Sequence, residues 1–144
     1  MDNIDKLCMG CMNIKKNDIC EICGYNGDNK PYALRLRTIL DNRYIVGAQK
    51  SKNANSIEYI GFDKVLCCRV YIIEFFPKNL CMRDRNSNNI ILRKIDKDCY
   101  YNNLNVFLNR FRDVARFRDL SSIGPIYNIF SENNTGYAIC EYIE

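Results

Sequence analysis

Four cysteines near the start of the chain have the types and spacing of a metal site. They form two Cys-x-x-Cys pairs with eight residues between the pairs: Cys8, Cys11, Cys20 and Cys23. Each pair can present two thiolates from one tight turn, and four thiolates in a tetrahedron are a preferred ligand set of Zn²⁺. Gly10 lies inside the first pair and Gly24 directly follows the second, which suits such turns. The spacing therefore predicts a zinc site.

The predicted site is structural, because four cysteines leave no open coordination position for a substrate. Residues 1–27 are too few to bury a core, so the metal would supply most of the folding energy of this segment. The segment resembles a short bacterial zinc ribbon. Only Lys15 and Lys16 add positive charge between the pairs. We therefore expect an interaction or capping module and do not favour nucleic acid as its ligand.

Composition excludes several classes of protein. The chain has 144 residues, nine cysteines and no histidine, which removes His-based triads and His-ligated metals. An odd number of cysteines without an export signal argues against a disulfide framework and predicts a cytoplasmic protein. No apolar run approaches the roughly 20 residues of a membrane span. The net charge of +4 is modest and would fall by about two when four thiolates bind one Zn²⁺.

The other cysteines form no Cys-x-x-Cys pair, so we expect them to be buried or inert thiols: Cys67, Cys68, Cys81, Cys99 and Cys140.

The elements that must position these residues read as an α+β unit after a turn-rich linker at 28–40. Short β-branched and aromatic segments predict strands at 43–49, 57–62, 65–76, 90–95, 126–130 and 136–142. Apolar residues at i, i+3, i+4 and i+7 predict an amphipathic helix over 104–118. We interpret the arginines of that helix as a solvated face, with docking of an acidic partner as the alternative: Arg110, Arg112, Arg116 and Arg118.

Several separated blocks carry a family resemblance. They are Arg43-Tyr44-Ile45-Val46-Gly47, Tyr59-Ile60-Gly61-Phe62-Asp63, the run from Val70 to Leu80, Arg83-Asp84, and the run from Thr135 to Glu144. In this order they resemble the N-terminal lobe of a bacterial Ser/Thr protein kinase, in a group with a zinc ribbon ahead of the kinase domain. The resemblance implies an antiparallel sheet of about five strands with one main helix. It divides the chain into a ribbon (1–27), a linker (28–40) and a lobe (41–144).

The resemblance also implies a degenerate ATP site. The family's three loop glycines, which let backbone amides approach the phosphates, are all replaced. Its lysine falls on Ile73, its small residue over the adenine on Tyr71, and its helix glutamate on Arg110. The positions that we expect to form this non-functional site are Ser51, Asn53, Ser56, Tyr71, Ile73, Arg110 and Cys140.

The hinge of the family matches residues 140–143, after which we expect no large lobe, no bound ATP and no catalysis by this chain alone. We expect instead a binding or regulatory module. It would self-associate or dock on a partner protein through the surface that a large lobe would cover. Two alternatives remain: half of a split kinase with a separate large lobe, and a nucleic-acid-binding zinc-ribbon protein with salt-dependent affinity.

Overall fold

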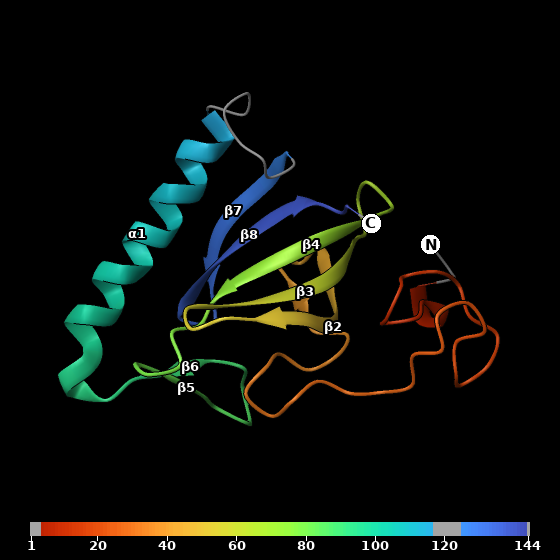
Figure 1. Ribbon diagram of the computed structural model, residues 1–144, viewed down its shortest axis with the longest axis horizontal. Coiled ribbons are helices and arrows are strands. Elements are labelled where there is room, and N and C mark those ends of the chain that lie inside the picture. Colours follow the sequence, from red (N-terminus) through yellow and green to blue (C-terminus); the bar gives the residue numbers. More distant parts are fainter. Residues whose placement is uncertain (1–3, 117–124, 144) are drawn as a thin grey trace.

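The computed structural model describes residues 4–116 and 125–143, and an antiparallel sheet of six strands is its centre (Figure 1). The strand order is β1-β2-β3-β4-β8-β7, and β5 pairs with β6 in a separate hairpin. The strands are β1 (Ile39–Leu40), β2 (Tyr44–Lys52), β3 (Ser56–Asp63), β4 (Cys68–Phe75), β5 (Met82–Arg83), β6 (Ile90–Ile91), β7 (Ile126–Glu132) and β8 (Thr135–Glu141).

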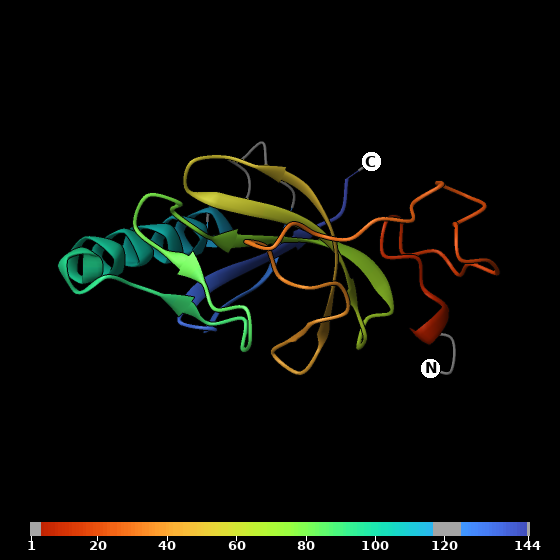
Figure 2. The ribbon, with the colours of Figure 1, turned by 90° about the horizontal axis from the view of Figure 1, so that it is seen from below.

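The helices are α1 (Lys97–Arg116) and two 3-10 turns, η1 (Ile4–Lys6) and η2 (Lys94–Asp96). In both views α1 lies at one end of the long axis and the cysteine-bearing segment at the other (Figures 1 and 2). No helix in the described part of the chain is long and apolar enough to cross a membrane.

The α+β class and the one main helix agree with the sequence prediction, but the sheet has six strands instead of about five. The additional strand is β1, whose two residues pair with β2. The strand predicted over 65–76 begins only at Cys68, because Asp63 accepts hydrogen bonds from the amides of Val65 and Leu66 and closes a turn there. The strand predicted over 90–95 is only the two residues of β6.

Helix α1 begins at Lys97 rather than at residue 104, and the predicted end at 117–118 lies outside the described residues. Its apolar stripe packs on the sheet, with Tyr100, Leu104, Leu108 and Phe111 buried. Gly136 of β8 permits this contact, because a Cβ there would lie 2.7 Å from Leu108.

Alternation along the strands gives the sheet two faces. One, which we call the core face, carries Tyr59, Ile72 and Ile139, all fully buried in the main hydrophobic cluster. Residues paired directly across neighbouring strands share a face, and this places Ile60, Tyr71 and Cys140 together on the other side. Ile45, Phe62, Glu58, Ile73 and Ala138 lie on that same side, which we call the groove face.

The segment at 28–40, which we expected to be a linker, is packed against the core face. Leu34 and Leu40 are fully buried in the main cluster. The Asn29 amide donates to the carbonyls of Leu34 and Gly47, at 2.9 and 3.0 Å, and its oxygen accepts the amide of Gln49 at 2.8 Å. These bonds make the segment part of the folded body.

A buried ion pair fastens the β5–β6 hairpin to the core face. Arg83 donates to both carboxylate oxygens of Glu74, at 2.6 and 2.9 Å, and the hydroxyls of Tyr59 and Tyr137 complete the shell of that carboxylate. Burial, followed by the neighbouring Glu74, raises the pKa of both tyrosines well above 10.0. Burial opposes the Arg83 charge, but Glu74 outweighs it and raises the pKa of Arg83.

Candidate functional site

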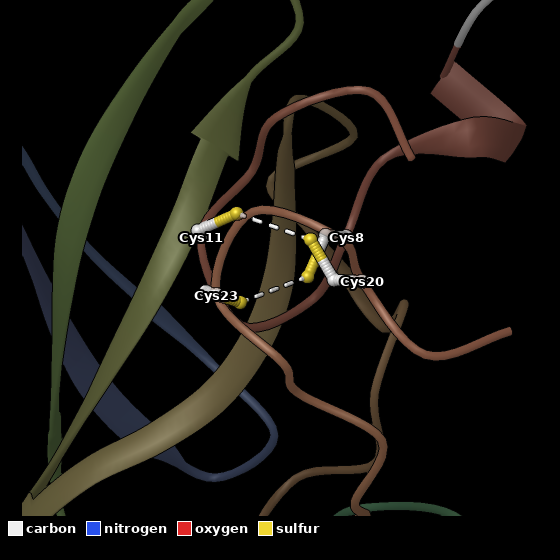
Figure 3. A group of neighbouring side chains, drawn as sticks. All are labelled: Cys8, Cys11, Cys20 and Cys23. Atoms are coloured by element: carbon white, nitrogen blue, oxygen red, sulfur yellow. Dashed lines mark hydrogen bonds between the residues drawn. The ribbon is translucent and has the colours of Figure 1, made fainter. Parts of the chain in front are cut away.

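The four cysteines of the two Cys-x-x-Cys pairs come together in space (Figure 3). Their Sγ atoms all lie within 4.8 Å of one another, with Cys8 and Cys23 3.5 Å apart and Cys11 and Cys20 3.9 Å apart. A tetrahedral zinc with bonds of about 2.3 Å would place its sulfurs about 3.8 Å apart. The prediction that these four residues cluster is confirmed, and the cluster could hold a metal ion.

Backbone amides shape each cysteine turn. The Gly10 amide donates to Cys8 Sγ at 3.3 Å, and the Ile22 amide donates to Cys20 Sγ at 3.4 Å. Gly10 is required by space, because a Cβ there would lie 2.4 Å from the Tyr25 side chain. Gly24 is required by conformation, since its φ is 78°. The local sequence therefore specifies both turns.

Hydrogen bonds and burial act in opposite directions on the thiols. Backbone amides, the Cys23 amide first, lower the pKa of Cys20 to about 7. Burial raises the pKa of Cys8 to about 12. A metal ion must therefore displace the proton of Cys8 as it binds, which couples metal affinity to pH.

The segment that carries the cysteines, residues 4–27, is docked on the groove face, and we call it the cysteine knuckle. The Ala48 amide of β2 donates to the Met9 carbonyl at 2.8 Å. Met9 and Met12 are buried in a cluster with Ile45 and Ile60 of the sheet. The knuckle is thus packed on the body and shares a core with it.

A groove of about 600 Å³ lies between the β2–β3 turn, β4 and α1, and some of the resemblance-derived positions line it. Four of them line it: Asn53, Ser56, Ile73 and Arg110. Phe75, Phe107 and Phe111 form an aromatic part of the groove lining. Val106, which also lines the groove, is 65% exposed. Ser51 is exposed on β2 and is absent from this lining.

Tyr71 and Cys140 lie on the groove face beside this groove, as directly paired residues of β4 and β8. The Tyr71 ring lies 4.9 Å from that of Tyr142, and the Arg69 guanidinium lies 4.8 Å from the Tyr142 ring. Burial, with a smaller contribution from Glu58, raises the pKa of Cys140 to about 12. Tyr71, which the resemblance assigns to the small residue over the adenine, is thus packed against a second tyrosine ring.

Sequence reasoning missed Glu58 as a member of this region, and it placed Tyr142 in the hinge block without its contacts. Glu58 pairs directly with Ile73, so strand alternation places its carboxylate on the groove face. That signal was available once β3 and β4 were aligned as a hairpin. Tyr142 follows β8 and joins the knuckle cluster, a contact between distant segments that no local pattern reveals.

The remaining cysteines differ in exposure. Cys140 is buried. Cys81 is half-buried, and burial raises the pKa of its thiol to about 12. Cys67 and Cys99 are exposed, so of the two expected states, buried or inert, burial does not apply to them. In the described part of the chain, none of these residues joins a group of three or more potential metal ligands.

The three helix arginines in the described part of the chain, Arg110, Arg112 and Arg116, are exposed, in agreement with a solvated face. Arg118 lies outside the described residues. Arg110 is exposed and also forms part of the groove lining.

The fold is kinase-like. The apo form of PpkA-294, a bacterial Ser/Thr kinase, matches this chain with a TM-score of 0.69 and 22% sequence identity. The match covers 77% of this chain and 39% of that chain, so it spans about two fifths of the solved protein. No protein-family model matches the chain, and no curated protein matches its sequence.

Proposed function

We propose that the protein is a catalytically inactive module with the fold of a kinase small lobe, which binds a partner protein or a second copy of itself. A structural zinc ion, held by the cysteine knuckle, would stabilise its N-terminal part. The sulfur geometry and the kinase-like fold support this proposal.

The observation that carries the proposal is the chemistry across the groove. The resemblance assigns Ile73 to the position of the family's phosphate-binding lysine and Arg110 to that of the glutamate that pairs with it, and both residues line the groove. An isoleucine and an arginine cannot form this ion pair. The groove face instead carries the carboxylate of Glu58, which would repel phosphates.

The lining of the groove supports a binding role. Ile73, Phe107 and Phe111 give it an apolar wall, and Val106 extends the apolar surface outward. Exposed apolar surface of this kind is typical of protein interaction sites. By the resemblance to a kinase small lobe, we infer that this is the side of the sheet that a large lobe would cover.

Native mass spectrometry of the purified chain, with and without Mg·ATP, tests the proposal. We expect one zinc per chain, no nucleotide adduct, and a defined dimer or a complex with a partner. A monomer that takes up nucleotide would contradict the proposal and favour the split-kinase alternative.

The Tyr71→Ala variant is the matched control. If a filled nucleobase position were the single obstacle to ATP, this variant would bind nucleotide. We expect it to remain free of nucleotide, because Ile73 and Arg110 still lack the chemistry that holds the phosphates.

A further inference from the structure

The residues that dock the knuckle on the sheet belong to the same turn as two of its cysteines. Met9 lies between Cys8 and Cys11, and Met12 directly follows the pair. This turn is closed by a hydrogen bond from the Met12 amide to the Cys8 carbonyl at 2.7 Å, with Met12 at a φ of 62°. The backbone that sets the positions of the Cys8 and Cys11 sulfurs therefore also sets the docking contacts.

The docking contact itself is close and includes polar bonds. The Met9 carbonyl accepts the Ala48 amide at 2.8 Å, and the Gly10 carbonyl accepts the Lys50 ammonium at 3.0 Å. A Cβ on Gly47 would lie 2.5 Å from Met12 Cε and 2.6 Å from the Met9 carbonyl oxygen. Such a contact tolerates little displacement of the turn.

Docking also covers apolar surface of the body. Ile45 and Ile60 are 2% and 0% exposed beneath the knuckle methionines. Tyr142 packs against the same cluster and, through its ring contact, reaches Tyr71. A displacement of the turn would therefore alter contacts along the groove face, from the knuckle methionines through Tyr142 to Tyr71.

The four thiols differ in their access to solvent. Cys23 is exposed, whereas Cys8 is buried, and their sulfurs lie 3.5 Å apart. Cys11 is half-buried and Cys20 is buried, with 3.9 Å between their sulfurs. The exposure of Cys23 makes it the point of attack for a small oxidant, and the Cys8 sulfur, 3.5 Å away, is a thiol partner within reach.

We propose that the knuckle is a thiol-responsive clamp, in which a peroxide converts Cys8 and Cys23 to a disulfide, releases the metal and undocks the knuckle from Ile45 and Ile60. This inference rests on the zinc site proposed above. It adds to that proposal a means of exposing apolar surface on the groove face.

The chemistry balances with hydrogen peroxide as the oxidant. The Cys23 thiolate attacks one peroxide oxygen, the O–O bond breaks, and a sulfenic acid and one water form after proton uptake. The Cys8 thiolate then attacks the sulfenic sulfur, the S–S bond forms, and a second water leaves after proton uptake. Two thiolates, one peroxide and two protons thus give one disulfide and two waters. Zinc leaves because two of its four thiolate ligands are lost.

Disulfide formation requires movement of the turn. The Sγ atoms must approach from 3.5 Å to about 2.05 Å, the length of an S–S bond. Because Met9 and Met12 share that turn with Cys8, we expect their contacts with β2 to break.

The test treats the zinc-loaded full chain with hydrogen peroxide and follows three quantities. We expect release of one zinc per chain, measured with a chromogenic chelator, and a Cys8–Cys23 disulfide, identified by peptide mapping. We also expect the Ala48 amide to exchange its hydrogen about tenfold faster, because it loses the Met9 carbonyl. Exchange in β8 serves as the internal reference and should not change.

Two cysteine variants and one glycine variant control the experiment. Cys67→Ser and Cys99→Ser remove exposed thiols outside the knuckle and should leave the response unchanged. Gly47→Ala should undock the knuckle without touching a cysteine, so it should keep zinc while the Ala48 amide exchanges fast before any peroxide is added. If Gly47→Ala fails to fold, Met12→Ala replaces it. This variant shortens the docking side chain, so it should also undock the knuckle while zinc stays bound.

Each outcome decides between the proposals. A chain that binds no zinc contradicts the proposed zinc site itself. Zinc release with an unchanged Ala48 exchange rate, or loss of the response in Cys67→Ser or Cys99→Ser, overturns the clamp and leaves the zinc site standing.

Discussion

Glu74 is a charged residue with no exposure to solvent. Four hydrogen bonds to its carboxylate compensate for the loss of water around it. Arg83, whose side chain is 2% exposed, supplies two of them. A buried pair of this kind contributes little net stability when intact, but removing one partner leaves the other charge buried alone. The pair therefore acts mainly to hold the β5–β6 hairpin in one position on the core face.

Glu74→Gln should destabilise the protein by about 3–5 kcal/mol, because the Arg83 charge would remain buried without a carboxylate. Urea unfolding followed by circular dichroism measures this change. Asp96→Asn is the matched control, since it breaks the pair with Arg93, whose side chain is 73% exposed, and should cost about 0–1 kcal/mol. A difference between the two variants below about 1 kcal/mol would show that Glu74 is not held as described.

Asp63 gives the protein an acid-sensitive contact at the β3–β4 turn. Burial alone would raise the pKa of Asp63, but hydrogen bonds from the Arg43 guanidinium and from the Leu66 and Val65 amides outweigh it and hold the pKa below 3.8. A carboxyl whose pKa is lowered on folding stabilises the folded state fully above its unfolded pKa. That contribution is lost as pH falls through the folded-state pKa.

Asp63→Asn should therefore destabilise the protein by about 1–2 kcal/mol at pH 7, because it weakens the bonds to Arg43 and the turn amides. The difference from the unmodified chain should shrink as pH falls below 3.8. Thermal unfolding at pH 7, 4 and about 2.5 measures both quantities. A difference that stays constant over this range would contradict the assigned charge state.

Packing between elements depends most visibly on Gly136, where β8 passes under α1. A Cβ at this position would lie 2.7 Å from Leu108 and 2.9 Å from Leu104. Gly136→Ala should cost about 1–3 kcal/mol, because the helix must shift on the sheet to admit it. Chemical denaturation compares it with Gly27→Ala, an exposed position where a Cβ would lie 3.3 Å from the Tyr25 ring and which should change stability by less than about 1 kcal/mol. Equal effects of the two variants would be evidence against a close helix–strand contact.

The elements that the sequence predicts well are those with periodic apolar residues. Strands β2, β3, β4, β7 and β8 are long enough to show alternation, and α1 shows its apolar stripe from Leu104 onward. The beginning of α1 was missed because Tyr100 is its one buried residue before Leu104. Two-residue strands such as β1 and β5 have no period to detect, since pairing with distant segments defines them.

The candidate site divides in the same way. The cysteine cluster follows from local spacing, because each Cys-x-x-Cys pair closes its own turn. The docking of Met12 on Gly47 and the ring contact of Tyr142 with Tyr71 join segments far apart in sequence. Such contacts depend on how the elements pack and leave no periodic pattern in the chain.

At the scale of the whole molecule, the knuckle and the sheet share one apolar cluster rather than forming two independent units. From the sequence alone, removal of zinc is expected to unfold residues 1–27 and to leave the lobe largely intact. The structure changes this expectation in one respect: loss of the knuckle exposes Ile45 and Ile60. We therefore expect the lobe to remain folded but to become less stable.

Chelation of zinc with EDTA should lower the stability of the lobe by about 2–4 kcal/mol, the free energy expected for partial exposure of two isoleucines and their methionine partners. The corresponding fall in Tm is on the order of 10 °C. The far-UV circular dichroism at room temperature should be largely retained, because within the described residues the knuckle contributes only η1 and one isolated bridge. The double variant Cys8→Ser, Cys11→Ser should melt at the lowered temperature with or without EDTA. Global loss of secondary structure on chelation would mean that the sheet cannot fold without the knuckle, whereas an unchanged Tm would mean that the knuckle does not stabilise the sheet at all.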